Sequence, residues 1–119
     1  MKKVLIVDDA QTVRKFERMM IEEMGYVAEE AINGLDGLEK LYNEKFDLAL
    51  VDINMPKMDG YEFTRQVRQD KEFGDLPIVI ISTESKETDK KKAYEAGANY
   101  FIVKPIKPET LKSLLKIFL

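Results

Sequence analysis

Three apolar runs of four residues, each followed at once by a charged side chain, constrain this chain more than any other feature. Val4–Val7 precedes Asp8 and Asp9, Leu48–Val51 precedes Asp52, and Tyr100–Val103 precedes Lys104. A continuous apolar run of this length indicates a strand covered on both faces, as in a parallel sheet. Ligands of open α/β sheets bind beyond the carboxyl ends of the strands. We therefore expect three carboxylates and one ammonium group at one edge of one sheet.

Strand patterns alternate with helical patterns along the whole chain. The expected strands cover residues 4–7, 26–30, 46–51, 78–81 and 100–103, and the second, with its two glutamates, is expected near a sheet edge. Five helices are expected between and after these strands. The first carries Val13, Phe16, Met20 and Met24 and ends at Gly25, and the second carries Leu35, Leu38 and Leu41. The others cover residues 61–70, residues 86–96 and a last segment that starts at Pro108. This alternation predicts an α/β fold with a parallel sheet and helices on both faces.

Composition limits the chemistry available to the chain. It has 119 residues, enough for one core, so we expect a single domain over residues 1–119 with no output domain. It contains no cysteine and no histidine, which excludes disulfides, Cys- or His-bound zinc, thiol nucleophiles and imidazole bases. Catalysis or binding must therefore use carboxylates, hydroxyls, lysines or a bound hard cation.

Charge and hydropathy exclude two further classes of partner. The net charge is −3, because residues 84–119 hold eight lysines against five carboxylates while the first 83 residues carry −6. This balance is too mild for nucleic-acid binding. No apolar stretch reaches the roughly 18 to 20 residues that span a bilayer, so no membrane contact is expected. The N-terminus has no signal-peptide pattern, and a cytoplasmic location is the expectation.

The carboxylates admit two interpretations. Asp8 and Asp9 can be helix N-cap residues, and Asp52 can be a turn residue that ends a strand. Together, however, they are expected to converge, because the first and third strands should be neighbours. Like charges about 4 Å apart repel by about 4 kcal/mol at an effective dielectric of about 20. A cation would offset this repulsion, and a few carboxylates with open water positions suit Mg²⁺; a structural ion-pair network is the alternative.

Ser82 and Lys104 end two further strands at the same sheet edge. Ser82 is either a loop or cap residue or a hydroxyl donor to a bound oxyanion. Lys104 is either a surface lysine or a point-charge clamp for phosphate. Pro105, which follows the lysine, makes a cis peptide accessible and would fix the direction of the lysine.

The chain resembles the receiver domains of two-component response regulators in four segments: VLIVDD, LALVDINMPKMDG, VIISTES and YFIVKP. The resemblance covers essentially all 119 residues and is greatest to single-domain, chemotaxis-type (CheY-like) response regulators. It implies a flavodoxin-like (βα)5 fold. This is a doubly wound parallel sheet of five strands in the order 2-1-3-4-5, with the site at the point where the strand order reverses.

The resemblance also implies a role for each residue at this edge. Asp52 would be the phosphoacceptor. Asp9 would bind Mg²⁺ directly and Asp8 largely through water, while Asp52 and the backbone carbonyl of Asn54 would complete the protein ligands; Mn²⁺ is the expected substitute. Lys104 would pair with the phosphoryl group. Such a chain receives its phosphoryl group from a histidine kinase and catalyses only its own phosphorylation and dephosphorylation.

Four further positions concern the switch and the lifetime of the phosphoryl group. Ser82 would be the switch hydroxyl and Phe101 the aromatic that changes rotamer with it, although plain core packing explains Phe101 equally well. Thr83 stands where the family usually has a very small residue, and it would narrow access to the acceptor or weaken a backbone contact to the phosphoryl group. Asn54 and Glu84 would flank an attacking water and tune dephosphorylation to give a short-lived state; polar loop residues are the alternative.

The expected output is a change of shape read by a separate protein, most often in chemotaxis or motility. We expect a monomer that meets its downstream target through residues 86–119. Helix 86–96 should be lightly anchored by Ala93 and Ala96. It displays Lys86, Lys90, Lys91 and Lys92, either as an ordinary solvated face or as a surface for an acidic partner.

Three other functions remain open from the sequence. A receiver fold could serve as a phosphorelay intermediate that passes its phosphoryl group to a second histidine protein. Phosphatases of the haloacid dehalogenase class use similar groups but carry Asp-x-Asp, whereas this chain has Asp52-Ile53-Asn54. A nucleotide-binding module would need a glycine pattern that is absent. The cognate kinase, the target, the phosphoryl lifetime and any dimerisation are not determined by the sequence.

Overall fold

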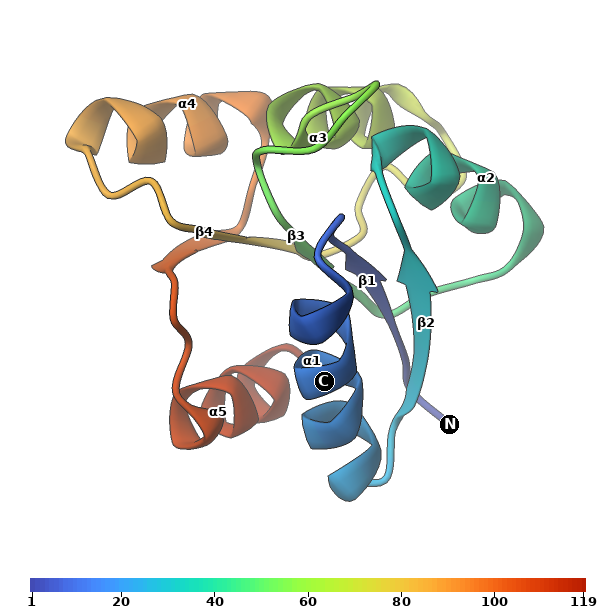
Figure 1. Cartoon of the computed structure of the whole chain (residues 1–119). Coiled ribbons are helices and arrows are strands. Elements are labelled where there is room, and N and C mark those ends of the chain that lie inside the picture. Colours follow the sequence, from blue (N-terminus) through green and yellow to red (C-terminus); the bar gives the residue numbers. More distant parts are fainter.

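The computed structural model describes residues 1–119 and alternates strands with helices along the chain (Figure 1). The elements are β1 (Lys3–Val7), α1 (Gln11–Glu23), β2 (Val27–Ala31), α2 (Gly34–Asn43), β3 (Leu48–Val51), α3 (Gly60–Gln69), β4 (Ile78–Ser82), α4 (Glu87–Ala96), β5 (Tyr100–Val103) and α5 (Pro108–Phe118). All five strands are parallel, in the order β2-β1-β3-β4-β5. This is the expected flavodoxin-like order, with β2 at an edge.

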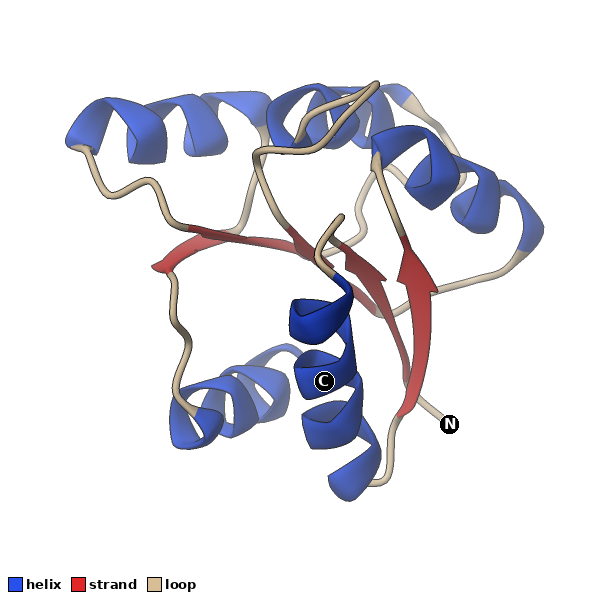
Figure 2. Cartoon of the chain, in the orientation of Figure 1, coloured by secondary structure: helices blue, strands red, loops and turns tan.

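The helices form two layers around the sheet. Figure 2 shows α2, α3 and α4 on one face and α1 and α5 on the other. Successive strand residues point to opposite faces. Leu5 and Val7 therefore join the cluster that contains Phe63 of α3, while Val4 and Ile6 join the cluster that contains Leu115 of α5. Burial on both faces explains why the strands are continuous apolar runs. None of the helices is long and apolar enough to cross a membrane.

Glycines follow two of the helices, and the first of them, Gly25, stands where the sequence predicts a helix end. Gly25 and Gly97 have φ values of 85° and 111°, in the left-handed region that favours glycine at the end of a helix. The strand expected at 46–51 starts only at Leu48. Before it, the Asp47 N–H donates to the carbonyl of Lys3, and the Asp47 carboxylate accepts a hydrogen bond from the Lys3 N–H, each at 2.8 Å.

One expected core position is wrong. Leu35 was expected to share an apolar stripe with Leu38 and Leu41, but its side chain is 48% exposed. Gly34 and Gly37 are buried on the inner face of α2 instead. Gly37 permits this close approach, because a Cβ there would lie 2.8 Å from the ring of Phe63.

The loop between β3 and α3 is held tightly against the end of β3. The Gly60 N–H donates to the carbonyl of Ile53 at 2.9 Å, and any side chain at Gly60 would collide with the carbonyl oxygen of Asp52. Asp59 caps α3 by accepting a hydrogen bond from the Glu62 N–H at 2.9 Å. The Asp-Gly pair that ends this loop therefore fixes the backbone that carries Asp52.

Candidate functional site

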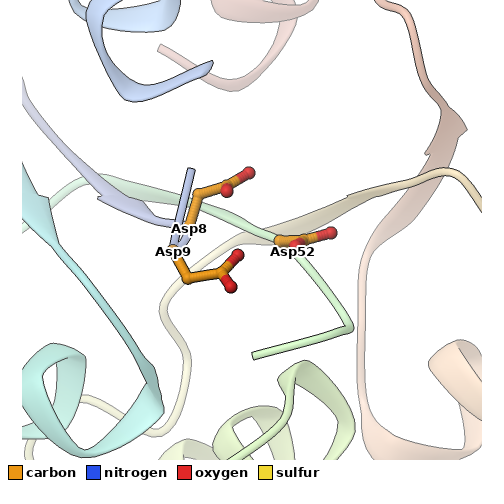
Figure 3. A group of neighbouring side chains, drawn as sticks. All are labelled: Asp8, Asp9 and Asp52. Atoms are coloured by element: carbon orange, nitrogen blue, oxygen red, sulfur yellow. The ribbon is translucent and has the colours of Figure 1, made fainter. Parts of the chain in front are cut away.

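Three carboxylates meet at the carboxyl ends of β1 and β3. The two strands are paired neighbours, and the Asp52 N–H donates to the carbonyl of Val7 at 2.9 Å. One carboxylate oxygen each from Asp8, Asp9 and Asp52 lies within 4.8 Å of the others (Figure 3). Asp8 and Asp52 are buried, whereas Asp9 is exposed. The sequence-based expectation that these residues converge is confirmed, because β1 and β3 are neighbours.

Asp8 is held by the loop that leads into α1. Its Oδ1 accepts a hydrogen bond from the Ala10 N–H at 2.8 Å. The Arg14 guanidinium donates to the carbonyl oxygen of Asp8 at 2.7 Å. Helix α1 has Ala10 at its N-cap and no side-chain cap, so the interpretation of Asp8 and Asp9 as helix N-cap residues is wrong.

Lys104 joins the two buried carboxylates from the end of β5. Its ammonium nitrogen lies 2.9 Å from Asp8 Oδ2 and 3.3 Å from Asp52 Oδ1, and only 15% of its side chain is exposed. It is therefore not a free surface lysine. Burial alone lowers the pKa of Lys104, but the hydrogen bond and charge of Asp8, with the charge of Asp52, outweigh burial and raise it. The Lys104–Pro105 peptide is cis.

For Asp52, the same burial and neighbouring charges raise the pKa and so disfavour the charged form. Burial raises the pKa of the Asp52 carboxyl, and the negative charge of Asp8 raises it further. Lys104 lowers this pKa without cancelling the rise. An uncompensated negative charge therefore remains at the site, and the exposed Asp9 adds to it. This all-oxygen set fits a hard divalent cation such as Mg²⁺, which Asp8, Asp9 and Asp52 could hold.

Ser82 and Phe101 lie on adjacent strands next to this group. Ser82 ends β4, is fully buried, and accepts a hydrogen bond at its Oγ from the Glu84 N–H at 3.1 Å. Phe101 is 7% exposed and packs in the cluster under α2, α3 and α4. Thr83, directly after Ser82, is exposed. The expected core packing of Phe101 is thus present, and it is compatible with a switch role.

Asn54 and Glu84 meet across the outer side of the site. The Asn54 side-chain amide donates to Glu84 Oε1 at 3.3 Å, which joins the loop after β3 to the loop after β4. The sequence suggested a shared role for the two residues but not a direct contact.

Glu17 is the one residue near the site that the sequence analysis missed. It lies on α1, is 2% exposed, and has its pKa raised to about 8, first by burial and then by the charges of Asp8 and Asp52 in excess of Lys104. A signal was present. Glu17 stands four residues after Val13, inside the apolar stripe of that helix.

Comparisons with known proteins agree with this geometry. A family model described as the response regulator receiver domain matches residues 4–116. The chain belongs to this family. It is 37% identical over 119 residues to the chemotaxis protein CheY1 of Helicobacter pylori, covering 98% of this chain and 96% of that protein. It is 41% identical over 115 residues to the sensor histidine kinase CheAY of the same species, covering 95% of this chain but only 14% of that protein.

A solved structure confirms the fold. The chemotaxis protein CheY4 of Vibrio cholerae superposes with a TM-score of 0.94 at 36% identity, covering 100% of this chain and 99% of that one. The receiver family, the flavodoxin-like fold and the likeness to CheY-type chemotaxis proteins are thereby shown. Membership in this family also sets aside the phosphatase and nucleotide-binding alternatives.

We expect Glu17→Gln to stabilise the metal-free protein in a pH-dependent way. Between pH values of about 4.5 and 8 the folded chain keeps a proton on Glu17 that the unfolded chain has lost, so the free energy of unfolding falls as pH rises through this window. Glutamine cannot ionise, so Glu17→Gln should raise the free energy of unfolding by about 3 kcal/mol at pH 7 and by almost nothing near pH 4.5. Urea unfolding with a chelator present, at several pH values, measures the difference. The control is Glu23→Gln at an exposed position of α1; parallel stability curves for Glu17→Gln and wild type would contradict the prediction.

Proposed function

We propose that this chain is a stand-alone response regulator whose Asp52 accepts a phosphoryl group from the phosphohistidine of a histidine kinase, with Mg²⁺ as cofactor. It would work as a cytoplasmic monomer and signal to a separate protein, in chemotaxis or motility. The placement of Asp52 carries the proposal. It is a buried carboxylate at the sheet edge, 3.3 Å from the Lys104 ammonium and grouped with Asp8 and Asp9.

The proposed reaction is phosphoryl transfer to a carboxylate. An oxygen of Asp52 attacks phosphorus, the bond from phosphorus to the kinase histidine breaks, and the histidine nitrogen keeps the electron pair. The product is an acyl phosphate on Asp52. Water later attacks the same phosphorus, the bond to the Asp52 oxygen breaks, and inorganic phosphate leaves a free carboxylate. Such transfer depends mainly on positioning and on charge stabilisation.

The residues around Asp52 supply both requirements. Lys104, already within ion-pair distance of Asp52, would stabilise negative charge on the phosphoryl oxygens. Ser82 would donate its hydroxyl to one of these oxygens. Asp8, Asp9 and Asp52, with the carbonyl of Asn54, would hold the metal ion. Bound Mg²⁺ would neutralise charge on the phosphoryl group.

The output would travel from Ser82 to α4. The Ser82 Oγ now accepts a hydrogen bond from the Glu84 N–H, so movement of the hydroxyl toward a phosphoryl group, to which it would donate, would break this bond. Phe101 lies in the same core cluster as Ala93 of α4, so a rotamer change there would reach this helix. Only Ala93 and Ala96 of α4 are buried, which leaves the helix lightly anchored. Thr83 would narrow access to Asp52.

The target surface is proposed to lie on residues 86–119. Helix α4 exposes Lys91 and Lys92 without an ion pair, while Lys90 lies 3.6 Å from Glu87. Lys86 is exposed at the start of the helix. This charge favours an acidic partner.

A phosphorelay role is the second candidate. The observation that favours it is the 41% identity to a stretch of a protein that is itself a sensor histidine kinase, CheAY. A relay would return its phosphoryl group to a second histidine-containing phosphotransfer protein. Back-transfer from the phosphorylated chain to such a domain would favour the relay, and its absence favours the terminal signal.

Intact mass measurement after incubation with a small phosphodonor tests the acceptor. We expect one phosphoryl adduct that needs both Mg²⁺ and Asp52, and none for Asp52→Asn, because the amide is not nucleophilic at this site. The matched control is Asp59→Asn in the same loop, where asparagine keeps the cap of α3 and the adduct should form. An adduct on Asp52→Asn at the wild-type rate would refute the assignment.

Substitution of Asn54 or Glu84 should change the lifetime of the phosphoryl group. The two side chains are joined at 3.3 Å beside the proposed path of the attacking water, so Asn54→Ala or Glu84→Ala should slow hydrolysis by about tenfold, equivalent to about 1.4 kcal/mol in the barrier. Decay of the phosphorylated protein in the presence of Mg²⁺, after removal of the phosphodonor, measures this. Glu87→Gln, exposed at the start of α4, is the control; wild-type lifetimes in both variants would exclude the tuning role.

Charge reversal on α4 tests the partner surface. Lys90→Glu combined with Lys91→Glu should weaken binding of the phosphorylated chain to its target by about tenfold, mostly through slower association that depends on salt. A binding titration at two salt concentrations measures the effect. Lys71→Glu, exposed outside this face, should bind normally. Unchanged binding by the α4 double variant would place the surface elsewhere.

A further inference from the structure

A cavity of about 330 Å³ opens beside the phosphorylation site, between α1 and the segment that follows β5. Its apolar walls are formed by Val13 and Phe16 of α1, Ile81 of β4, and Pro105 and Ile106. This volume lies within the range of small-molecule sites, which are mostly apolar with a few polar groups that orient the ligand. Among the residues that line this cavity, Glu17 is the one whose buried carboxyl group needs an explanation.

Glu17 is buried without a partner. Its side chain lines the cavity and is 2% exposed, yet no hydrogen bond or ion pair reaches its carboxyl group. Every fully hidden polar side-chain atom of the protein has a hydrogen-bond partner. The carboxyl oxygens of Glu17 must therefore keep the small residual exposure, and the cavity is the space onto which they open. A buried carboxyl group without a donor is unfavourable unless a ligand supplies one.

The charges around Glu17 select the kind of donor. Asp8 after β1 and Asp52 after β3 are negative, and Lys104 after β5 is the one cation that acts on Glu17. The Lys104 ammonium is already held at 2.9 Å and 3.3 Å by the two aspartates, so its charge is compensated. Neither β4 nor the segment after Lys104 adds a charged side chain to the cavity wall. This surrounding repels an anion and favours a cation that can donate hydrogen bonds.

We propose that this cavity binds a small organic ammonium ion. Its apolar body would fill the space between Phe16, Ile81 and Ile106, and its ammonium would donate to the Glu17 carboxylate. No part of this assignment depends on phosphorylation. Because Lys104 also borders the cavity, a ligand in this site would lie next to the lysine that pairs with Asp52.

The probe is 2-phenylethylammonium, and the comparison is 2-phenylethanol, which has the same apolar body with a neutral hydroxyl. Titration is followed by backbone amide shifts of the metal-free, full-length protein labelled with ¹⁵N. We expect saturable shifts confined to residues around Phe16, Ile81 and Ile106, with the alcohol binding at least about tenfold more weakly, as expected for loss of a charge-assisted bond. No saturable shift, or equal binding of the alcohol, would overturn the proposal.

Substitution and pH separate the carboxylate from the apolar walls. Glu17→Gln keeps the shape of the side chain and should weaken binding of the amine by about tenfold or more while leaving binding of the alcohol unchanged. Glu23→Gln, exposed on the same helix, should leave both unchanged. Binding of the ammonium must ionise Glu17, so wild-type affinity should rise by about tenfold per pH unit below a pKa of about 8 and then level off. Amine affinity that is independent of pH and of Glu17→Gln would refute the site.

Discussion

The ion pairs of Lys104 with Asp8 and Asp52 are the interactions on which the site depends. Parallel pairing of β1 with β3 places two buried carboxylates side by side, and like charges about 4 Å apart repel by about 4 kcal/mol at an effective dielectric of about 20. Lys104 reaches both from β5, two strands away from β3 in the sheet. One ammonium cannot neutralise three carboxylates, so the site stays negative and suited to a divalent cation.

The loops around this group turn a charged cluster into a positioned one. Gly60 presses the start of α3 onto the end of β3, so the backbone of Asp52 has little freedom. Glu84 is bound twice, through its N–H to Ser82 and through its side chain to Asn54. A change at the Ser82 hydroxyl would therefore be felt in the loop that leads directly into α4. Preorganisation of this kind is what phosphoryl transfer requires.

The helices and strands could be predicted from the sequence because strands buried on both faces are continuous apolar runs, and helices that cover the sheet have apolar residues at helical spacing. Sequence reasoning located the carboxylates and Lys104 because strand ends meet at one sheet edge. It failed where the outcome depends on three-dimensional packing. Leu35 is exposed because the inner face of α2 is formed by two glycines together with Leu38 and Leu41. Asp8 accepts a hydrogen bond from the Ala10 N–H before α1 begins. The contact between Asn54 and Glu84 joins residues 30 positions apart, and no local pattern records it.

At Glu17 the sequence pattern and the fold disagree, because a carboxyl group occupies a buried position of α1. An apolar side chain at this position of the α1 stripe would suit the core better, because burial holds the carboxyl pKa near 8 and lowers stability at neutral pH. Local conflicts of this kind are concentrated at functional sites, where stability is exchanged for chemistry. Glu17 is buried at the edge of a cavity rather than within the packed core. The wall of this cavity also includes Lys104, which pairs with Asp52. Both facts point to a role at the cavity rather than to a packing defect.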